Sequence, residues 1–116
     1  TWGRKAKSFW PEAINDVRQQ HPHFCFMAEV YWEMEWTLQQ LGFDYTYDKT
    51  LYDRLKNLDA EGVRLHLEAA EDYQDHSLRF LENHDEERAA ETFGELANSN
   101  FALLCFLPLL LLLYFQ

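Results

Sequence analysis

Short apolar runs alternate with amphipathic stretches along most of the chain. Apolar runs bounded by turn residues predict buried strands at Phe24–Ala28, Phe43–Tyr47 and Leu78–Leu81. Stretches with apolar residues at three- and four-residue spacing predict helices over Ser8–Gln20, Glu33–Leu41, Leu51–Leu58, Ala60–Ala69 and Glu86–Leu96. Strands that alternate with helices are typical of an α/β fold built on a parallel sheet.

Residues with special backbone preferences predict where these helices begin and end. Ser8 is expected to cap the first helix, with Pro11 in its first turn, and the helix should end before Pro22. Gly42 is expected to end the second helix, and Asp59 to cap the helix that begins at residue 60.

The carboxyl-terminal part of the sequence is one long apolar run from Phe101 to Phe115, broken by Pro108. It is shorter than the roughly 18 consecutive apolar residues expected of a membrane span. We therefore predict a fourth buried strand and a tail in residues 101–116, whose register the pattern does not fix, and no membrane partner. A membrane-associated peptide held by this leucine-rich tail is the alternative.

Composition narrows the class of protein. A chain of 116 residues is long enough for one small domain, and 47% hydrophobic residues argue against disorder. The formal net charge of -10 excludes nucleic acid as a partner, because the phosphate backbone would be repelled. Neutral polyhydroxylated ligands agree with this charge and with the 16% of aromatic residues.

Cysteines and histidines give little chemistry. Cys25 and Cys105 both lie in apolar runs, which predicts free, buried thiols, with a disulfide as the alternative. Free thiols favour the cytoplasm, although the localisation stays open. No zinc-ligand spacing is present among the cysteines and histidines, so no metal is predicted.

Acidic residues follow two of the predicted strands directly. Glu29 follows Phe24–Ala28, and Asp85 closes the polar string Glu82–Asp85 after Leu78–Leu81. Because the carboxyl ends of parallel strands meet at one edge, we expect both carboxyl groups in one cleft. We expect a separation wider than the roughly 5 Å between acid and nucleophile in retaining glycosidases.

Each of these residues also has a structural explanation. Glu29 is expected to be partly desolvated, which would raise its pKa and suit a general acid, or else it simply starts the next helix in solvent. Asp85 could cap the helix predicted over Glu86–Leu96, with Arg88 as its ion-pair partner. His84 alone could be a structural histidine.

The same residues carry a resemblance to a known family. FLENHDE at Phe80–Glu86 resembles the seventh-strand motif of the alpha-amylase family of glycoside hydrolases, and AEVYW at Ala28–Trp32 resembles its fifth-strand motif. GFDYTYDKTLYDRL at Gly42–Leu55 resembles the segment that follows in a bacterial branch of the family. The similarity extends from Phe9 to about Phe106. It implies a partial (β/α)8 TIM barrel, roughly its fifth to eighth strands.

The resemblance also implies a retaining mechanism on alpha-linked glucosides. Glu29 matches the general acid/base, and Asp85 matches the carboxylate that stabilises the oxocarbenium-like transition state. The expected partner is an alpha-glucan or a small alpha-glucoside. The expected substrate-binding residues are His84, Asn83, Trp32 and Tyr31, with a place in the core as the alternative for Trp32.

The sequence departs from the family before its fifth-strand motif. The family's nucleophile is an aspartate on the fourth strand, and nothing before Glu29 fits, since Asp16 falls inside the predicted helix. Residues 1–116 are therefore expected to be the carboxyl-side part of a catalytic barrel that starts after the nucleophile strand, inactive alone and prone to self-association through exposed barrel edges. Asp44 could face the cleft, but it is assigned no role.

The resemblance leaves several functions open. An alpha-glucosyl transferase or phosphorylase of the same family would share these motifs, and a non-catalytic carbohydrate- or partner-binding module could retain them. No cofactor is expected. Calcium is common in the family, but its usual ligands would come from parts of the fold outside these residues.

Overall fold

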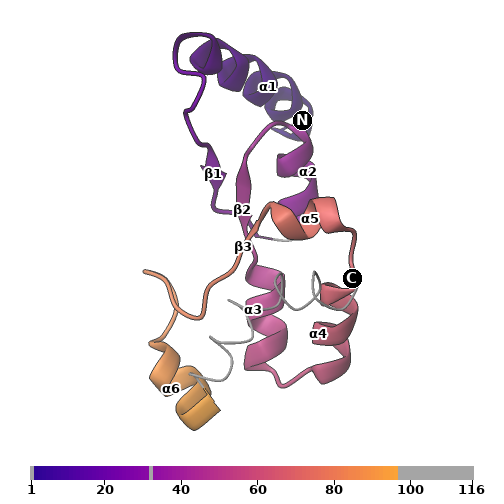
Figure 1. The fold of residues 1–116 in the computed structure, drawn as a ribbon, viewed down its shortest axis with the longest axis vertical. Helices are drawn as coiled ribbons and strands as arrows, with labels where there is room; N and C mark the ends of the chain where they lie inside the picture. The colour runs from indigo at the N-terminus through magenta and orange to yellow at the C-terminus, as the bar shows by residue number, and fades with distance from the viewer. Residues whose placement is uncertain (1, 32, 97–116) are drawn as a thin grey trace, which may run out of the picture.

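The computed structural model describes residues 2–31 and 33–96, which form helices around a small parallel sheet (Figure 1). In chain order the elements are α1 (Trp2–Gln20), β1 (Met27–Ala28), α2 (Glu35–Gln40), β2 (Tyr45–Tyr47), α3 (Lys49–Lys56), α4 (Ala60–Leu67), α5 (Glu71–Asp75), β3 (Ser77–Leu78), α6 (Ala89–Phe93) and the 3₁₀ helix η1 (Gly94–Leu96). The predicted strand at residues 101–115, Cys105 and Trp32 lie outside the described residues.

The strands form a three-stranded sheet in the order β1-β2-β3, and both pairs are parallel. Met27 pairs with Tyr45, and Tyr47 pairs with Leu78. The predicted α/β class with a parallel sheet is therefore confirmed. Each strand is shorter than predicted. Only two or three residues of each strand pair with a neighbouring strand, and the rest of each apolar run is irregular chain.

The sheet is covered on one face. Ala28 is 7% exposed and packs in a core cluster with Ile14 and Phe43, and the Thr46 hydroxyl accepts a hydrogen bond from Gln39 of α2. On the other face Met27 is 59% exposed. The expectation of a first strand buried on both faces is therefore wrong: no element in the described part of the chain covers that face at Met27.

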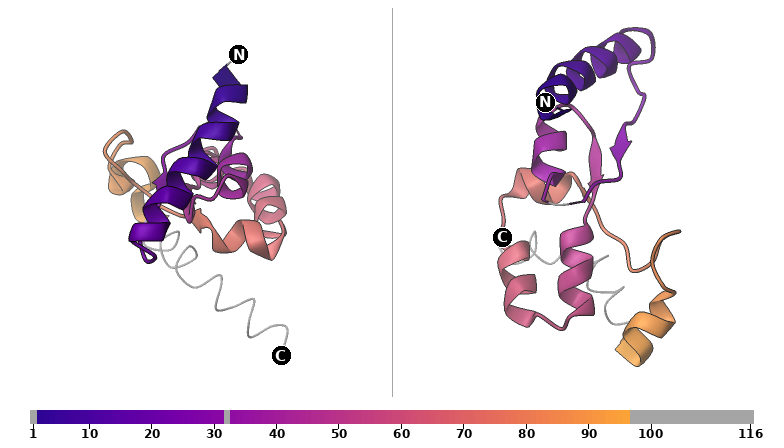
Figure 2. Two further views of the ribbon diagram at one scale, coloured as in Figure 1. Left: turned by 90° about the horizontal axis from the view of Figure 1, so that it is seen from above. Right: turned by 180° about the vertical axis from the view of Figure 1, so that it is seen from behind.

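A second core lies beyond the carboxyl ends of the strands. It joins α3, the segment after β3 and α6 through Leu51, Tyr52, Leu55, Leu81 and Phe93. Tyr52 is fully buried and stacks on Phe80 with ring centroids 5.2 Å apart. Figures 1 and 2 show α1 at one end of the sheet and the antiparallel pair α3 and α4 at the other. The carboxyl end of the sheet therefore faces the α3–α4 pair.

Several predicted helix boundaries agree with the structure. Helix α1 ends at Gln20, two residues before Pro22, and Gly42 ends the α2 region with a φ of 106°, which only glycine adopts without strain. The side chain of Asp59 accepts a hydrogen bond from the Gly62 N–H and so caps α4, as predicted.

Other helix boundaries differ from the prediction. Helix α1 begins at Trp2 rather than after Ser8, so Pro11 lies inside it. Good helix formers upstream, Lys5 to Lys7, extend the helix past the one hydrogen bond that proline removes. Helix α3 begins at Lys49 because Asp48 caps it, and the short helix α5 has no counterpart in the sequence pattern.

Burial corrects a further expectation. The prediction of a buried Cys25 is wrong, because the segment before β1 runs along the surface and leaves Cys25 as a free, exposed cysteine.

None of the helices in the described part of the chain is long and apolar enough to cross a membrane.

Candidate functional site

Four side chains that follow β1 and β3 meet at the carboxyl end of the sheet. The Tyr31 hydroxyl lies 2.9 Å from Glu29 Oε1, to which it donates, and 3.5 Å from Asp85 Oδ2. His84 Nε2 lies 3.8 Å from Glu29 Oε1 and 3.6 Å from Asp85 Oδ2. Glu29, Tyr31, His84 and Asp85 are called the carboxylate cluster below.

The two outer strands place this cluster. Glu29 directly follows β1 and precedes the buried Val30, which fixes the chain direction there. His84 and Asp85 lie in the loop between β3 and α6, so they sit farther from their strand than the sequence pattern predicts. The carboxyl ends of β1 and β3 flank that of β2, which is why residues so distant in sequence come together.

Hydrogen bonds shape the loop that carries His84 and Asp85. Asn83 Oδ1 accepts from the N–H groups of Asp85 and Glu86, both at 2.9 Å. Lys49 of α3 pairs with Glu86 at 2.9 Å, and its hydrogen bond holds the pKa of that carboxyl below the usual value. Asn83 thus orders the loop, and its predicted contact with substrate stays a prediction.

The cluster corrects the expected burial of its members. The side chains of Glu29, Asp85 and His84 are 39%, 56% and 66% exposed, so Glu29 is not the desolvated strand-end carboxyl that the sequence predicts. The capping alternative for Asp85 is also wrong. Helix α6 begins only at Ala89, and Arg88 pairs with Glu82 at 2.9 Å instead.

The separation of the two carboxyl groups is narrower than expected. Glu29, His84 and Asp85 each offer one atom, and these atoms lie within 4.8 Å of one another. The prediction that both carboxyl groups lie together at the carboxyl ends of the strands is confirmed, and their common cleft stays a prediction. The prediction of a gap wider than about 5 Å is wrong. The reason is that Tyr31 and His84 lie between the carboxylates and draw them together.

The same atoms could in principle ligate a cation. Glu29, His84 and Asp85 present two carboxylates and an imidazole, all on the surface. Structural metal sites usually bring four ligands together in a closed shell, and carboxylates gather on protein surfaces without a metal. This group therefore does not by itself identify a metal site.

The Tyr31 phenol should titrate far above its ordinary range. The hydrogen bond to Glu29, burial and the charges of Glu29 and Asp85 raise its pKa from 10.0 to about 12. Its interactions should therefore contribute stability below about pH 10, which is lost as the pH rises through about 12. We expect the Tyr31 Cζ resonance, assigned by Tyr31→Phe, to move only near pH 12.

Replacing the neighbouring carboxylate gives the control for this titration. Glu29→Gln removes the leading cause of the shift, so the pKa of Tyr31 should move back toward 10. A Tyr31 midpoint near 10 in the unmodified, folded chain would show that the cluster does not assemble in solution.

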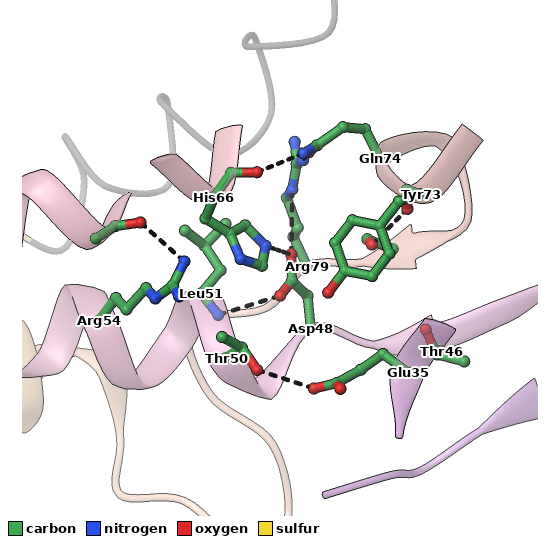
Figure 3. A network of polar contacts seen from close by, with 12 residues as sticks. Glu35, Thr46, Asp48, Thr50, Leu51, Arg54, His66, Tyr73, Gln74 and Arg79 are labelled. Carbon is green, nitrogen blue, oxygen red and sulfur yellow. Dashed lines mark hydrogen bonds and ion pairs between the residues drawn. The ribbon is translucent and has the colours of Figure 1, made fainter. Parts of the chain in front are cut away.

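A second polar network is buried between α3, α4 and the segment after β3 (Figure 3). Asp48 is 1% exposed, and its Oδ2 lies 2.9 Å from His66 Nε2 on α4 and 3.6 Å from Arg79 Nε. Its Oδ1 accepts from the Leu51 N–H at 3.1 Å and caps α3. Three segments distant in sequence thus meet on one carboxylate. No local pattern indicates this network, because His66 lies in an ordinary amphipathic stretch with no metal-ligand spacing around it.

Asp44 lies at the amino end of the sheet, opposite the carboxyl end where the carboxylate cluster lies. It precedes β2, pairs with Arg18 of α1 at 2.7 Å and accepts from the Phe26 N–H at 2.7 Å. It therefore holds α1 against the amino end of the sheet and does not face the cluster.

Comparison of the chain with family models, with curated proteins and with solved structures gave no match.

Proposed function

We propose that this chain supplies the acid/base and the transition-state-stabilising carboxylate of a retaining glycoside hydrolase that acts on alpha-glucosidic linkages. The observation that carries the proposal is the meeting of Glu29 and Asp85, with Tyr31 and His84 between them, at the carboxyl edge of a parallel sheet. The motifs that resemble the alpha-amylase family lie on these same residues.

The open face of the sheet supports a partial barrel. Parallel sheets normally have both faces covered, yet here Met27 and its cross-strand partner Tyr45 are 59% and 40% exposed. In a closed (β/α)8 barrel the face opposite the helices is the packed interior. Further strands beside β1 and β3 would bury these side chains and close both sheet edges.

The cluster would supply the general acid and the stabilising carboxylate of the mechanism, but not its nucleophile. Glu29 would give its proton to the glycosidic oxygen as the bond to the sugar breaks, and Asp85 would stabilise the positive charge that develops on the ring. The attacking carboxylate of the covalent step would come from a strand outside these residues. Glu29 and Asp85 are exposed, so their side chains can change rotamer to admit a sugar ring.

Sugar binding tests the proposal directly. We expect these 116 residues to bind maltose weakly, and Asp85→Asn to weaken that binding because a carboxylate is a stronger acceptor for sugar hydroxyls than an amide. Isothermal titration calorimetry measures the affinity, with Asp75→Asn on the exposed surface of α5 as the matched control. Equal affinity for maltose in both variants would remove Asp85 from the site.

Activity gives a second test. The chain alone should not turn over maltoheptaose, because the nucleophile of the proposed mechanism belongs to a strand that these residues do not include. It should also self-associate through the open sheet face. Chromatography with light scattering reports the oligomeric state, and release of reducing sugar reports turnover. A soluble monomer that hydrolyses maltoheptaose would overturn the partial-barrel proposal.

A further inference from the structure

A hollow of about 310 Å³ is lined by residues of α2, α4 and α5. Trp36 of α2 and Tyr73 of α5 line it together with Leu65 and His66 of α4, and none of the four residues of the carboxylate cluster does. Its volume lies at the lower end of the roughly 300–1,000 Å³ that is typical of small-molecule sites. This hollow is called the α2–α5 pocket below.

The charge around the pocket is negative. The pocket shares four lining residues with a larger adjoining hollow of about 450 Å³. Together the two hollows are lined by four carboxylates and two cationic side chains: Glu33, Glu35, Asp53, Asp59, Lys49 and Arg54. An excess of carboxylates favours a positively charged ligand and disfavours an anion.

The two cationic side chains are already engaged by other groups. Lys49 Nζ pairs with Asp53 at 2.5 Å and with Glu86 at 2.9 Å. Arg54 Nη1 donates to the Gly62 carbonyl at 2.9 Å. Neither side chain lies within ion-pair distance of a carboxylate of the pocket itself, so the negative charge there is not cancelled by a direct contact.

A buried carboxylate lines the pocket without a charged partner. Glu35 is 3% exposed, and its Oε1 accepts from the Thr50 hydroxyl at 3.0 Å. Its Oε2 accepts no hydrogen bond from any residue in the described part of the chain. A buried carboxylate is costly unless it is paired, and a neutral donor offsets less of this cost than a cation does. The second oxygen of Glu35 is therefore suited to a cationic ligand.

Aromatic rings form another part of the wall. Trp36 is 45% exposed, and its ring lies 6.3 Å from the Tyr73 ring, centroid to centroid, with the two planes tilted by 52°. Both rings line the pocket. The face of an aromatic ring attracts a cation within about 6 Å of its centroid, most strongly for tryptophan. Rings beside a carboxylate are the surroundings that an ammonium ion with apolar substituents prefers.

The Tyr73 phenol reflects the sign of the electrostatic potential. Burial and the charges of Asp48 and Glu35 raise its pKa to about 12, although the charge of Arg54 acts in the opposite direction. Figure 3 shows the Tyr73 ring reaching toward the carboxyl groups of Asp48 and Glu35. A potential that disfavours a negative phenolate favours a positive ligand at the same place.

We propose that the α2–α5 pocket binds a small organic ammonium ion, with its charge against Oε2 of Glu35 and its apolar groups against the rings of Trp36 and Tyr73. Metal ions suit the pocket less well, because calcium takes six to eight oxygen ligands and the two rings offer none. The inference is independent of the proposed function, since none of the carboxylate cluster lines this pocket.

Choline chloride is the probe for this site, and 3,3-dimethylbutan-1-ol is its neutral isostere, with carbon in place of the charged nitrogen. Saturation-transfer NMR on the methyl protons of each probe measures binding to the 116-residue chain, with sodium chloride holding the ionic strength constant. We expect choline to bind at least about tenfold more tightly than the isostere, because cation–π attraction and the Glu35 charge act on choline alone.

Two substitutions test the wall of the pocket. Glu35→Gln keeps an oxygen that can accept from Thr50 but removes the charge, and Trp36→Ala removes the exposed ring. Each should weaken choline about tenfold. Glu91→Gln is the control for charge, because Glu91 is exposed and lines neither hollow. Phe24→Ala is the control for the ring, because Phe24 is 52% exposed and lies outside both.

Several outcomes would overturn the ammonium site. Absence of saturation transfer to choline would do so, and equal binding of choline and its isostere would show an apolar hollow instead. Full choline affinity in Trp36→Ala, or an equal loss in Glu91→Gln, would place the cation elsewhere on the acidic surface. If Glu35→Gln loses its circular dichroism, Trp36→Ala decides alone. Maltose binding and its loss in Asp85→Asn test the proposed function separately.

Discussion

Asp48→Ala should lower the free energy of unfolding by about 3–5 kcal/mol, the cost typical of removing one partner of a buried ion pair. The Asp48 carboxylate is the only group that the described structure places against both His66 Nε2 and Arg79 Nε, at 2.9 Å and 3.6 Å. The side chains of His66 and Arg79 are 5% and 9% exposed, so the charge of Arg79 would be left buried without its partner. Small domains have only about 5–15 kcal/mol of stability in total, so this loss should remove a large fraction of the stability of the chain.

A second capping aspartate in the same chain separates the two contributions of Asp48. Asp59 also caps a helix, accepting from the Gly62 N–H at 2.9 Å, but it is exposed and pairs with no cation in the described part of the chain. Asp59→Ala should therefore cost only about 1 kcal/mol, the usual value of a helix cap. Urea unfolding followed by circular dichroism measures both variants. Similar losses in the two would mean that the buried network adds nothing beyond the cap.

This difference shows which parts of the fold can be predicted from the sequence. The Asp59 cap and the Gly42 stop follow from local chemistry, because one side chain or one backbone angle decides them. The Asp48 network depends on α4 returning against the end of β2, a contact across 18 residues that no local pattern encodes. The helix start at Trp2 departs from the prediction because the helix formers on both sides of Pro11 together outweigh the one hydrogen bond that it removes.

The candidate site divides in the same way. The rule that parallel strands end at a common edge is enough to predict from the sequence that Glu29 and Asp85 lie together. It does not give their exposure or their separation, because those depend on the loop that Asn83 shapes and on Tyr31 lying between them. Glu35 carries no signal in the sequence, since a glutamate at the start of a predicted helix gives no sign that it will be 3% exposed.

Glu29→Gln should lower turnover of natural alpha-glucans by about 10²- to 10⁴-fold in a polypeptide that combines this chain with the proposed nucleophile strand. Glutamine keeps the size of the side chain and can still accept from Tyr31, so sugar binding should be retained while the transferable proton is lost. Steady-state kinetics on maltoheptaose measures the loss. Glu87→Gln is the matched control, because Glu87 is an exposed glutamate two residues from Asp85 with no role in the cluster.

The choice of substrate makes this result specific for a general acid. An aryl glucoside whose phenol leaves as a stable anion needs no proton from the enzyme, so its bond cleavage should be almost as fast in Glu29→Gln as in the unmodified protein. A residue that only positions the sugar would slow both substrates alike, because both place the same ring against Asp85 and His84. The comparison uses kcat/KM, which reports bond cleavage, because the later hydrolysis of the glycosyl-enzyme needs Glu29 as a base for both substrates. Equal losses in kcat/KM on maltoheptaose and on the aryl glucoside would therefore assign Glu29 to binding and leave the cluster without an acid.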